Sequence, residues 1–304
     1  MSMATPGEIQ FFDRASRRVV TETVLGDGLL KWAYTSPCSS LLRWPLFGTA
    51  CLSRLLGWYA DLGISRRRIA PTVAQLGIRL EEFQVPEGGY RSFNEFFCRH
   101  IQPGARDFAT RRDDSVLSSP ADCRLLVWPQ LQDDTCLLVK GTPFTVGELL
   151  GERGRQYAET FRNGSLCICR LCPADYHRYH FPASGEVLES WRLRGKYHSV
   201  NPVAIAAGFK VFSQNVRQVS ILKYDKFGLG AFIEVGAFGV ASINNTHGGG
   251  QFQGGEEKGY FTFGGSTIIL VFAPQVVRFS EDIVSHSAQG LETLVKAGEE
   301  IART

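Results

Sequence analysis

The chain has 304 residues, of which 44% are hydrophobic and 21% are charged, so it can bury a sizeable core and is expected to be globular. Its formal net charge of +3 is too small to indicate a nucleic-acid-binding protein. Residues 1–10 lack the basic start and apolar core of a signal peptide, and Glu8 and Asp13 argue against a transit peptide.

The most hydrophobic early segment covers residues 39–60. Its uncharged run between Arg43 and Arg54 has 10 residues, whereas a membrane-spanning helix needs about 20. An amphipathic helix in the membrane plane fits this pattern, because tryptophan and tyrosine prefer the interface and residues 66–68 are three arginines that can meet anionic headgroups. A helix packed on the protein's own core is the equally weighted alternative.

Two short helices are predicted from capping signals. Ser92 and Glu95 have capping-box spacing, and so do Thr145 and Glu148. From about residue 116 onward, β-strand patterns dominate. Strands are expected at residues 124–128, 136–139, 166–171, 219–224, 232–235 and 267–272.

The cysteines do not form a metal site by their spacing. Cys167, Cys169 and Cys172 form a C-x-C-x-x-C pattern, but no second cluster completes a four-ligand zinc site. Leucine and isoleucine between these cysteines indicate a buried strand instead. We therefore expect free, reduced thiols in a cytoplasmic compartment and no bound metal, with a structural metal as the alternative.

A serine behind two glycines, ahead of the apolar residues 268–272, can support self-cleavage. Without side chains at Gly264 and Gly265, the Ser266 hydroxyl can reach the carbonyl carbon of Gly265. An N-to-O acyl shift, β-elimination and hydrolysis would then leave a pyruvoyl group at position 266. Such a ketone can form an imine with a substrate amine and accept the electron pair released with carbon dioxide. An ordinary turn entering a strand is the alternative for this motif alone.

A serine hydroxyl needs a base and a carboxylate that orients the base. His177 and His180 lie close together in the sequence, and Asp122 follows Ser-Pro-Ala in a predicted turn. Each residue alone also has an ordinary explanation. An aspartate there can be a solvated turn residue, and a histidine beside tyrosines can be a hydrogen-bonded core group.

Several segments occur in a specific order and together resemble the signature of the phosphatidylserine decarboxylase family. They are SPAD, DYHRYHFP, YHSVNP, EKGYFTFGGST and GLETLVKAGEEI. The N-terminal segments FFDR, WAYTSP and YRSFNEFFCR are similar to the clostridial group of these enzymes. The resemblance covers most of the chain and implies decarboxylation of phosphatidylserine to phosphatidylethanolamine with a pyruvoyl cofactor and no metal.

The resemblance also implies residue roles. Asp122 and His180 match the family aspartate and the histidine that activates Ser266 for self-cleavage. His177 matches the other family histidine, to which we assign a part in decarboxylation, as the group that protonates the α-carbon. Ser199 resembles a family serine near the bound substrate.

The expected fold is α+β, with an N-terminal helical region on a β-rich catalytic body that has a barrel-sandwich-like core. The helical, membrane-associating region is placed at residues 1–115 and the catalytic domain at 116–304. Cleavage between Gly265 and Ser266 would give chains 1–265 and 266–304. These two chains should stay associated, because residues 268–272 would form a buried strand.

The expected partners are phosphatidylserine and an anionic membrane surface, and a homodimer is compatible with this interpretation. The resemblance places the protein as a peripheral membrane protein on the cytoplasmic face. Two alternatives remain: a pyruvoyl enzyme that acts on a free amino acid, and an uncleaved, non-catalytic membrane-binding relative. Cys123 favours the second slightly, because family members usually have glycine there and a cysteine would be strained at a positive φ.

Overall fold

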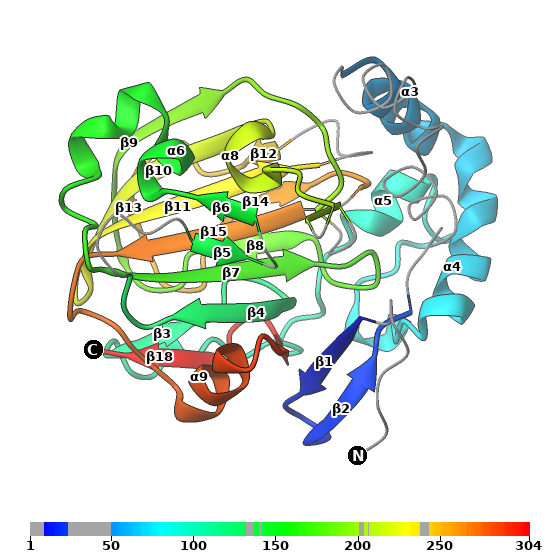
Figure 1. Ribbon diagram of the computed structural model, residues 1–304. Coiled ribbons are helices and arrows are strands. Elements are labelled where there is room, and N and C mark those ends of the chain that lie inside the picture. Colours follow the sequence, from blue (N-terminus) through cyan, green and yellow to red (C-terminus); the bar gives the residue numbers. More distant parts are fainter. Residues whose placement is uncertain are drawn as a thin grey trace.

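The computed structural model describes residues 9–23, 50–131, 137–139, 142–200, 204–205, 207–237, 243–264 and 266–304. An open ten-stranded sheet forms its centre (Figure 1). In spatial order the strands are β13 (Gly250–Phe252), β9 (Gly185–Leu193), β10 (Arg217–Tyr224), β11 (Gly228–Gly236), β15 (Ser266–Phe272), β7 (Ser165–Leu171), β4 (Cys123–Trp128), β17 (Glu292–Val295), β1 (Gln10–Asp13) and β2 (Arg18–Thr21). Neighbouring strands are antiparallel, except that β1 and β17 run parallel.

Smaller sheets flank the large one. The first has the order β12 (Ile243–Asn245), β14 (Glu257–Phe261), β8 (Arg178–His180); its edge strand β8 contains His180, and His177 directly precedes that strand. The others are β16 (Arg278–Phe279), β18 (Glu300–Arg303), β3 (Val116–Ser118), and the pair β5 (Leu137–Val139), β6 (Thr142–Phe144).

Two hydrophobic clusters cover opposite faces of the large sheet. Side chains alternate between faces along a strand, and β15 contributes Ile268, Leu270 and Phe272 to one cluster and Ile269 and Val271 to the other. Every residue of β15 is buried. The unbroken apolar run is therefore what a strand buried on both faces requires.

Short helices surround the sheets. They are α3 (Ala50–Asp61), α4 (Ile69–Leu76), α5 (Phe93–Phe97), α6 (Val146–Leu150), α8 (Val211–Gln214) and α9 (Glu281–Ala288), with 3-10 helices at Gly63–Arg68, Leu80–Glu82, Ala109–Arg111 and Glu152–Tyr157. Figure 1 shows α3, α4 and α5 grouped at one side of the β-rich body. None of the helices in the described ranges is long and apolar enough to cross a membrane.

Both predicted helix starts are confirmed. The Thr145 side chain accepts a hydrogen bond from the Glu148 N–H and Glu148 returns one to Thr145, which is a complete capping box. Ser92 accepts from the Glu95 N–H, but the Glu95 carboxylate bonds Arg91 instead of the Ser92 N–H. Helix α5 consequently has a one-sided cap, and it ends at Phe97.

The predicted α+β class with a β-rich body is confirmed, and the expected strands are present. Residue 136, the expected start of one strand, lies outside the described residues, as do residues 39–49 of the apolar segment. The large sheet stays open, so the core lies on its two faces and not inside a closed barrel. Residues 10–21 add β1 and β2 to this sheet, and a domain boundary near residue 115 stays a prediction.

Candidate active site

Ser266 is the first residue of β15, at the centre of the large sheet. It is paired with Gly236 of β11 on one side and with Leu171 of β7 on the other. Its side chain is completely buried, and its Oγ has no hydrogen-bond partner within the described residues. Because a buried hydroxyl without a partner costs free energy, stability does not explain this serine.

The turn before Ser266 depends on glycine. Gly264 has a φ angle of 143°, a conformation that residues with a side chain rarely adopt. We expect cleavage of the peptide bond between Gly265 and Ser266, but Gly265 lies outside the described residues. The φ angle of Gly264 nevertheless agrees with the predicted turn, in which this position must be a residue without a side chain.

Helix α5 contacts the same turn directly. The Phe263 N–H donates a hydrogen bond to Oδ1 of Asn94 at 2.7 Å. The Phe263 ring lies edge-on to Phe93 and Phe97, with ring centroids 4.9 and 5.4 Å apart. The approach to Ser266 is thus anchored by one polar and two aromatic contacts from the N-terminal helical group.

His177 is buried in its neutral form with one free nitrogen. Its Nδ1 lies 2.9 Å from the carbonyl oxygen of Asp175, and since a carbonyl can only accept, Nδ1 carries the proton. Its Nε2 is buried without a hydrogen-bond partner among the described residues. The centroid of its ring lies 3.8 Å from the centroid of the Phe97 ring. Burial and then the charge of Arg99 lower the pKa of His177 to about 3.

Arg99 is a buried cation beside His177. Its guanidinium lies over the rings of Phe83 and Phe96 and donates to the Asp175 carbonyl oxygen at 3.1 Å, the same oxygen that His177 uses. Within the described ranges it forms no ion pair with a carboxylate, and its Nε has no partner. A cation in this position disfavours protonation of the imidazole, so His177 is kept as a base.

His180 has both ring nitrogens occupied. Its Nδ1 donates to the Gly255 carbonyl oxygen at 3.1 Å, so its Nε2 accepts from the Tyr176 hydroxyl at 3.2 Å. Its backbone N–H donates to the Pro120 carbonyl oxygen at 2.9 Å, which joins β8 to the Ser-Pro-Ala-Asp turn. Burial lowers the pKa of His180 to about 4, so this imidazole is also neutral.

Asp122 is a fully buried carboxylate surrounded by donors. Arg106 binds it with two nitrogens at 3.0 and 2.7 Å, and Lys296 and the Ala297 N–H bind it at 3.1 and 2.9 Å. Burial opposes its charge, but Lys296 and Arg106 outweigh burial and hold its pKa well below the usual range. Arg106 also pairs with Glu82 at 2.8 Å.

The structure therefore brings the expected groups together only in part. The Asp122 turn and His180 are joined through the backbone. His177 directly precedes β8, and His180 is the last residue of this strand. Among the described residues, no direct hydrogen bond links Asp122, His180 and Ser266. The charged partners Arg106 and Lys296, and the cation Arg99, were not found by sequence reasoning, because no local motif identifies them.

Ser199 is buried close to the strand that pairs with Ser266. The Asn215 side chain donates to the carbonyl oxygens of His198 and Gly236 at 2.7 and 2.9 Å and accepts from the His198 N–H at 3.1 Å. Because Gly236 is the register partner of Ser266, this amide fixes the Ser199 segment near the start of β15. Asn215 is a further residue that the sequence did not reveal.

The cysteines contribute no strain and no metal site in the described ranges. Cys123 begins β4 in a buried position, and the condition for strain is absent, since the described non-glycine residues with positive φ are Arg17, Asn163 and Gln275. Cys167 and Cys169 lie buried in β7, which confirms the predicted strand. The described free cysteines are Cys98, Cys123, Cys167, Cys169 and Cys172. No group of three potential metal ligands occurs in the described part of the chain.

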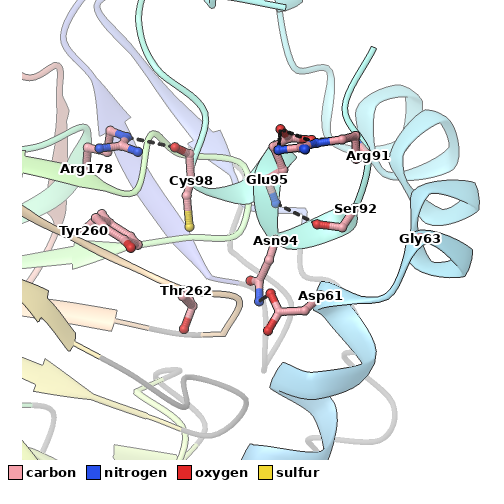
Figure 2. Close-up of a pocket in the computed structure, with 10 residues that line it drawn as sticks. All are labelled: Asp61, Gly63, Arg91, Ser92, Asn94, Glu95, Cys98, Arg178, Tyr260 and Thr262. Atoms are coloured by element: carbon pink, nitrogen blue, oxygen red, sulfur yellow. Dashed lines mark hydrogen bonds and ion pairs between the residues drawn. The ribbon is translucent and has the colours of Figure 1, made fainter. Parts of the chain in front are cut away.

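A cavity of about 490 Å³ lies beside the turn that leads to Ser266 (Figure 2). Its walls come from α3, α5, β8 and β14. The lining residues are Asp61, Gly63, Arg91, Ser92, Asn94, Glu95, Cys98, Arg178, Tyr260 and Thr262. The cavity therefore lies at the seam between the helical group and the β-rich body.

Comparison with known proteins assigns the family. The family model described as phosphatidylserine decarboxylase matches residues 93–303, which is more than half of the chain. The chain belongs to this family. All the candidate residues, from Asp122 to Ser266, lie within the matched range. The phosphatidylserine decarboxylases are carboxy-lyases, so this chain is a member of an enzyme family.

Curated relatives match along nearly the whole length. The phosphatidylserine decarboxylase proenzyme of Ruminiclostridium cellulolyticum is 39% identical over 294 residues, covering 96% of this chain and 97% of that protein. The proenzymes of Desulfitobacterium hafniense and Chlamydia trachomatis are 37% identical over 294 residues and 36% identical over 297 residues, with coverage of 96–97%. The predicted resemblance to the clostridial group is confirmed.

Proposed function

We propose that this chain is a self-processing enzyme that decarboxylates phosphatidylserine to phosphatidylethanolamine with a pyruvoyl group formed from its own Ser266. Membership of the phosphatidylserine decarboxylase family supports the substrate and the reaction. The observation that carries the processing step is the buried Ser266 Oγ, which has no hydrogen-bond partner among the described residues. It lies at the start of a central strand, directly after a turn that needs glycine.

In the proposed processing, Ser266 Oγ attacks the carbonyl carbon of Gly265 while a base takes the hydroxyl proton. The C–N bond breaks, its nitrogen takes a proton, and an ester replaces the amide. Loss of the Cα proton of residue 266 then expels the Gly265 carboxylate with the C–O bonding electrons. Water adds to the resulting imine tautomer and ammonia leaves, so a ketone remains. That ketone supplies an electrophile for the substrate amine and a sink for the electrons released with carbon dioxide.

Both histidines are neutral at physiological pH and can accept a proton. We assign the processing step to His180 and proton transfer during decarboxylation to His177. The Nε2 of His180 accepts from the Tyr176 hydroxyl, so His180 would act on Ser266 after this bond opens. The buried Nε2 of His177 carries a lone pair without such competition, which supports a separate role for it.

Asp122 is proposed to act indirectly, by holding the turn that positions His180. Its carboxylate is neutralised by Arg106 and Lys296 and does not bond His180. The turn that it stabilises presents the Pro120 carbonyl oxygen to the His180 N–H. Loss of the carboxylate would leave the buried Arg106 with Glu82 as its ion-pair partner and would remove the partner of Lys296, and the imidazole would lose its fixed backbone position.

The two products of cleavage should remain together. The segment 266–304 would contain β15 between β11 and β7, β17 between β4 and β1, and β18 beside β3. Strands of the small chain therefore pair on both sides with strands of the large chain. Breaking one bond at Ser266 leaves these ladders and the buried faces of β15 intact.

Helix α3 supports a proposed peripheral contact with an anionic membrane surface. Ser53, Gly57 and Ala60 form its buried face, so α3 packs on the protein. Leu55, Trp58 and Tyr59 lie on the opposite face with exposures of 56%, 61% and 40%. A helix packed on the protein's own core and a helix in the membrane plane were the two alternatives from the sequence. They are compatible, because one face of α3 packs inward while the other can enter the headgroup region.

The test uses the purified full-length chain. Denaturing electrophoresis should show two chains, and the intact mass of the small one should match residues 266–304 with an N-terminal ketone in place of the serine amine and hydroxyl. Vesicles that contain phosphatidylserine should release carbon dioxide, whereas free serine should not. A single uncut chain would overturn the processing proposal, and turnover of free serine alone would favour a free amino acid as substrate.

A further inference from the structure

We propose that Asn94 is a positioning residue for self-cleavage, which it controls by holding the turn before Ser266 against helix α3. This inference rests on the proposed function, because it concerns the processing step. Asn94 lies on α5, is 6% exposed, and belongs to neither histidine segment. Its side chain contacts the turn before Ser266 on one side and helix α3 on the other.

The two sides of the Asn94 amide have different partners, and these partners determine its orientation. Oδ1 accepts from the Phe263 N–H at 2.7 Å, so this atom must be the oxygen. Nδ2 donates to Oδ1 of Asp61 at 2.7 Å, with the Gly57 carbonyl oxygen at 3.5 Å, so this atom must be the nitrogen. Figure 2 shows the Asn94 amide directed at the Asp61 carboxylate at the end of α3.

Packing alone does not hold this stretch of backbone. The cavity of about 490 Å³ is lined by Thr262, the residue before Phe263, and by Asn94 itself. On that side the turn has space rather than packed atoms. The Phe263 ring is held by aromatic neighbours, but the backbone N–H depends on Asn94.

Position matters because the acyl shift is an intramolecular attack of the Ser266 hydroxyl on the carbonyl carbon of the preceding residue, Gly265. Such reactions depend steeply on alignment, and a misplacement of about 1 Å can cost ~100-fold in rate. The Phe263 N–H lies three residues before Ser266, so a shift there changes the path into the Gly264 turn. Asn94 therefore acts on the reaction through the backbone and touches no reacting atom.

The decisive experiment exchanges the amide and the carboxylate. Asn94→Asp alone puts a second carboxylate against Asp61 and should slow processing by ~10- to 100-fold. Asp61→Asn alone keeps an oxygen that accepts from Asn94 and should stay within ~3-fold of wild type. The double variant N94D/D61N restores both hydrogen bonds with the donor on residue 61, and it should return to within ~3-fold of wild type.

The rate is measured as the appearance of the two chains on denaturing gels after synthesis of the full-length protein at a fixed temperature. Hydroxylamine, which cleaves esters, should not accelerate cleavage of Asn94→Asp, because the defect lies before the ester forms. Ser92→Ala is the matched control: it removes the cap of the same helix but leaves the Phe263 contact. This control should melt at a lower temperature and still process within ~3-fold of wild type.

The outcomes separate this inference from the proposed function. If wild type itself stays uncut, the processing proposal fails. If wild type is cut and Asn94→Asp is cut at the same rate, Asn94 does not position the turn. If Asn94→Asp is slow but the double variant is equally slow, the exchange of hydrogen bonds is not the cause, and the inference is also wrong.

Discussion

The strands around Ser266 and the helical group α3 to α5 are built by different means, and the candidate site lies where they meet. Strand β15 is buried along its whole length between two hydrophobic clusters. The helical group has a small aromatic core around Phe93, Phe96 and Phe97, and α3 exposes Trp58 to solvent. A tightly packed sheet can position an attacking group precisely, whereas an exposed helix is free to contact a surface.

Polar residues of the helical region connect the two parts. Arg99 and Asn94 extend to the His177 segment and to the turn before Ser266, and Arg106 binds the Asp122 carboxylate. A few such hydrogen bonds suffice to join the helical group to the β-rich body, because a hydrogen bond has a defined geometry and is stronger when it is buried. The sheet thus forms the packed scaffold, and the helical group contributes polar side chains to the candidate site.

The largest effect should come from Ser266→Ala. Without the hydroxyl no acyl shift can begin, so the chain should stay at full length on a denaturing gel and release no carbon dioxide from phosphatidylserine. Ser165→Ala is the matched control, because this serine is also buried in the sheet and its Oγ has no hydrogen-bond partner in the described part of the chain. If the Ser165 variant also stayed uncut, loss of a buried hydroxyl in the sheet, rather than loss of the nucleophile, would explain the result.

Replacing the two histidines separately should divide the reaction into two halves. Loss of a general base costs about 10² to 10⁴ in rate, so His180→Asn should slow the appearance of the two chains by that factor. His177→Asn should process more readily than His180→Asn but should lose carbon dioxide release from the cleaved protein. Gel analysis and a carbon dioxide assay on the same preparations would check both. The reverse pattern would exchange the two assignments.

The exposed face of α3 should govern binding to vesicles without changing processing. Trp58→Glu removes an exposed aromatic group that can enter the interface, and it should weaken cosedimentation with phosphatidylserine vesicles by ~10-fold. Leu188→Glu makes the same kind of change on an exposed apolar residue of β9 and should bind like wild type. Equal binding by all three proteins would remove the proposed membrane role of α3.

The smallest effect is a pH dependence of stability that originates at buried histidines. The pKa values of His177, His180 and His198 are lowered to about 3, 4 and 4, whereas an unfolded histidine titrates near ~6.5. The unfolded chain therefore binds more protons as pH falls below ~6.5, so stability is present above this value and is lost toward pH ~4. The melting temperature should drop by several degrees between pH 7 and 5. A His177→Gln variant should show a smaller drop, and an unchanged slope would contradict this origin.

Much of the scaffold could be predicted from local patterns. The apolar run after Ser266 predicted β15, leucine and isoleucine among the cysteines predicted β7, and the spacing of Thr145 and Glu148 predicted α6. Strand β9 was missed because it is half-exposed and carries charged side chains. The strands β16 and β18 were missed because two to four residues are too short for a periodic signal.

The sequence by itself identified the predicted cleavage site at Gly265 and Ser266, the histidine pair as candidate bases, and the family, since each depends on short motifs and their order along the chain. Only the tertiary structure decided that Asp122 binds Arg106 and Lys296 rather than His180. It likewise decided which ring nitrogen of His177 is free. The physical reason is that such hydrogen bonds depend on strand register and on contacts between segments far apart in the chain, which hydrophobic periodicity does not encode.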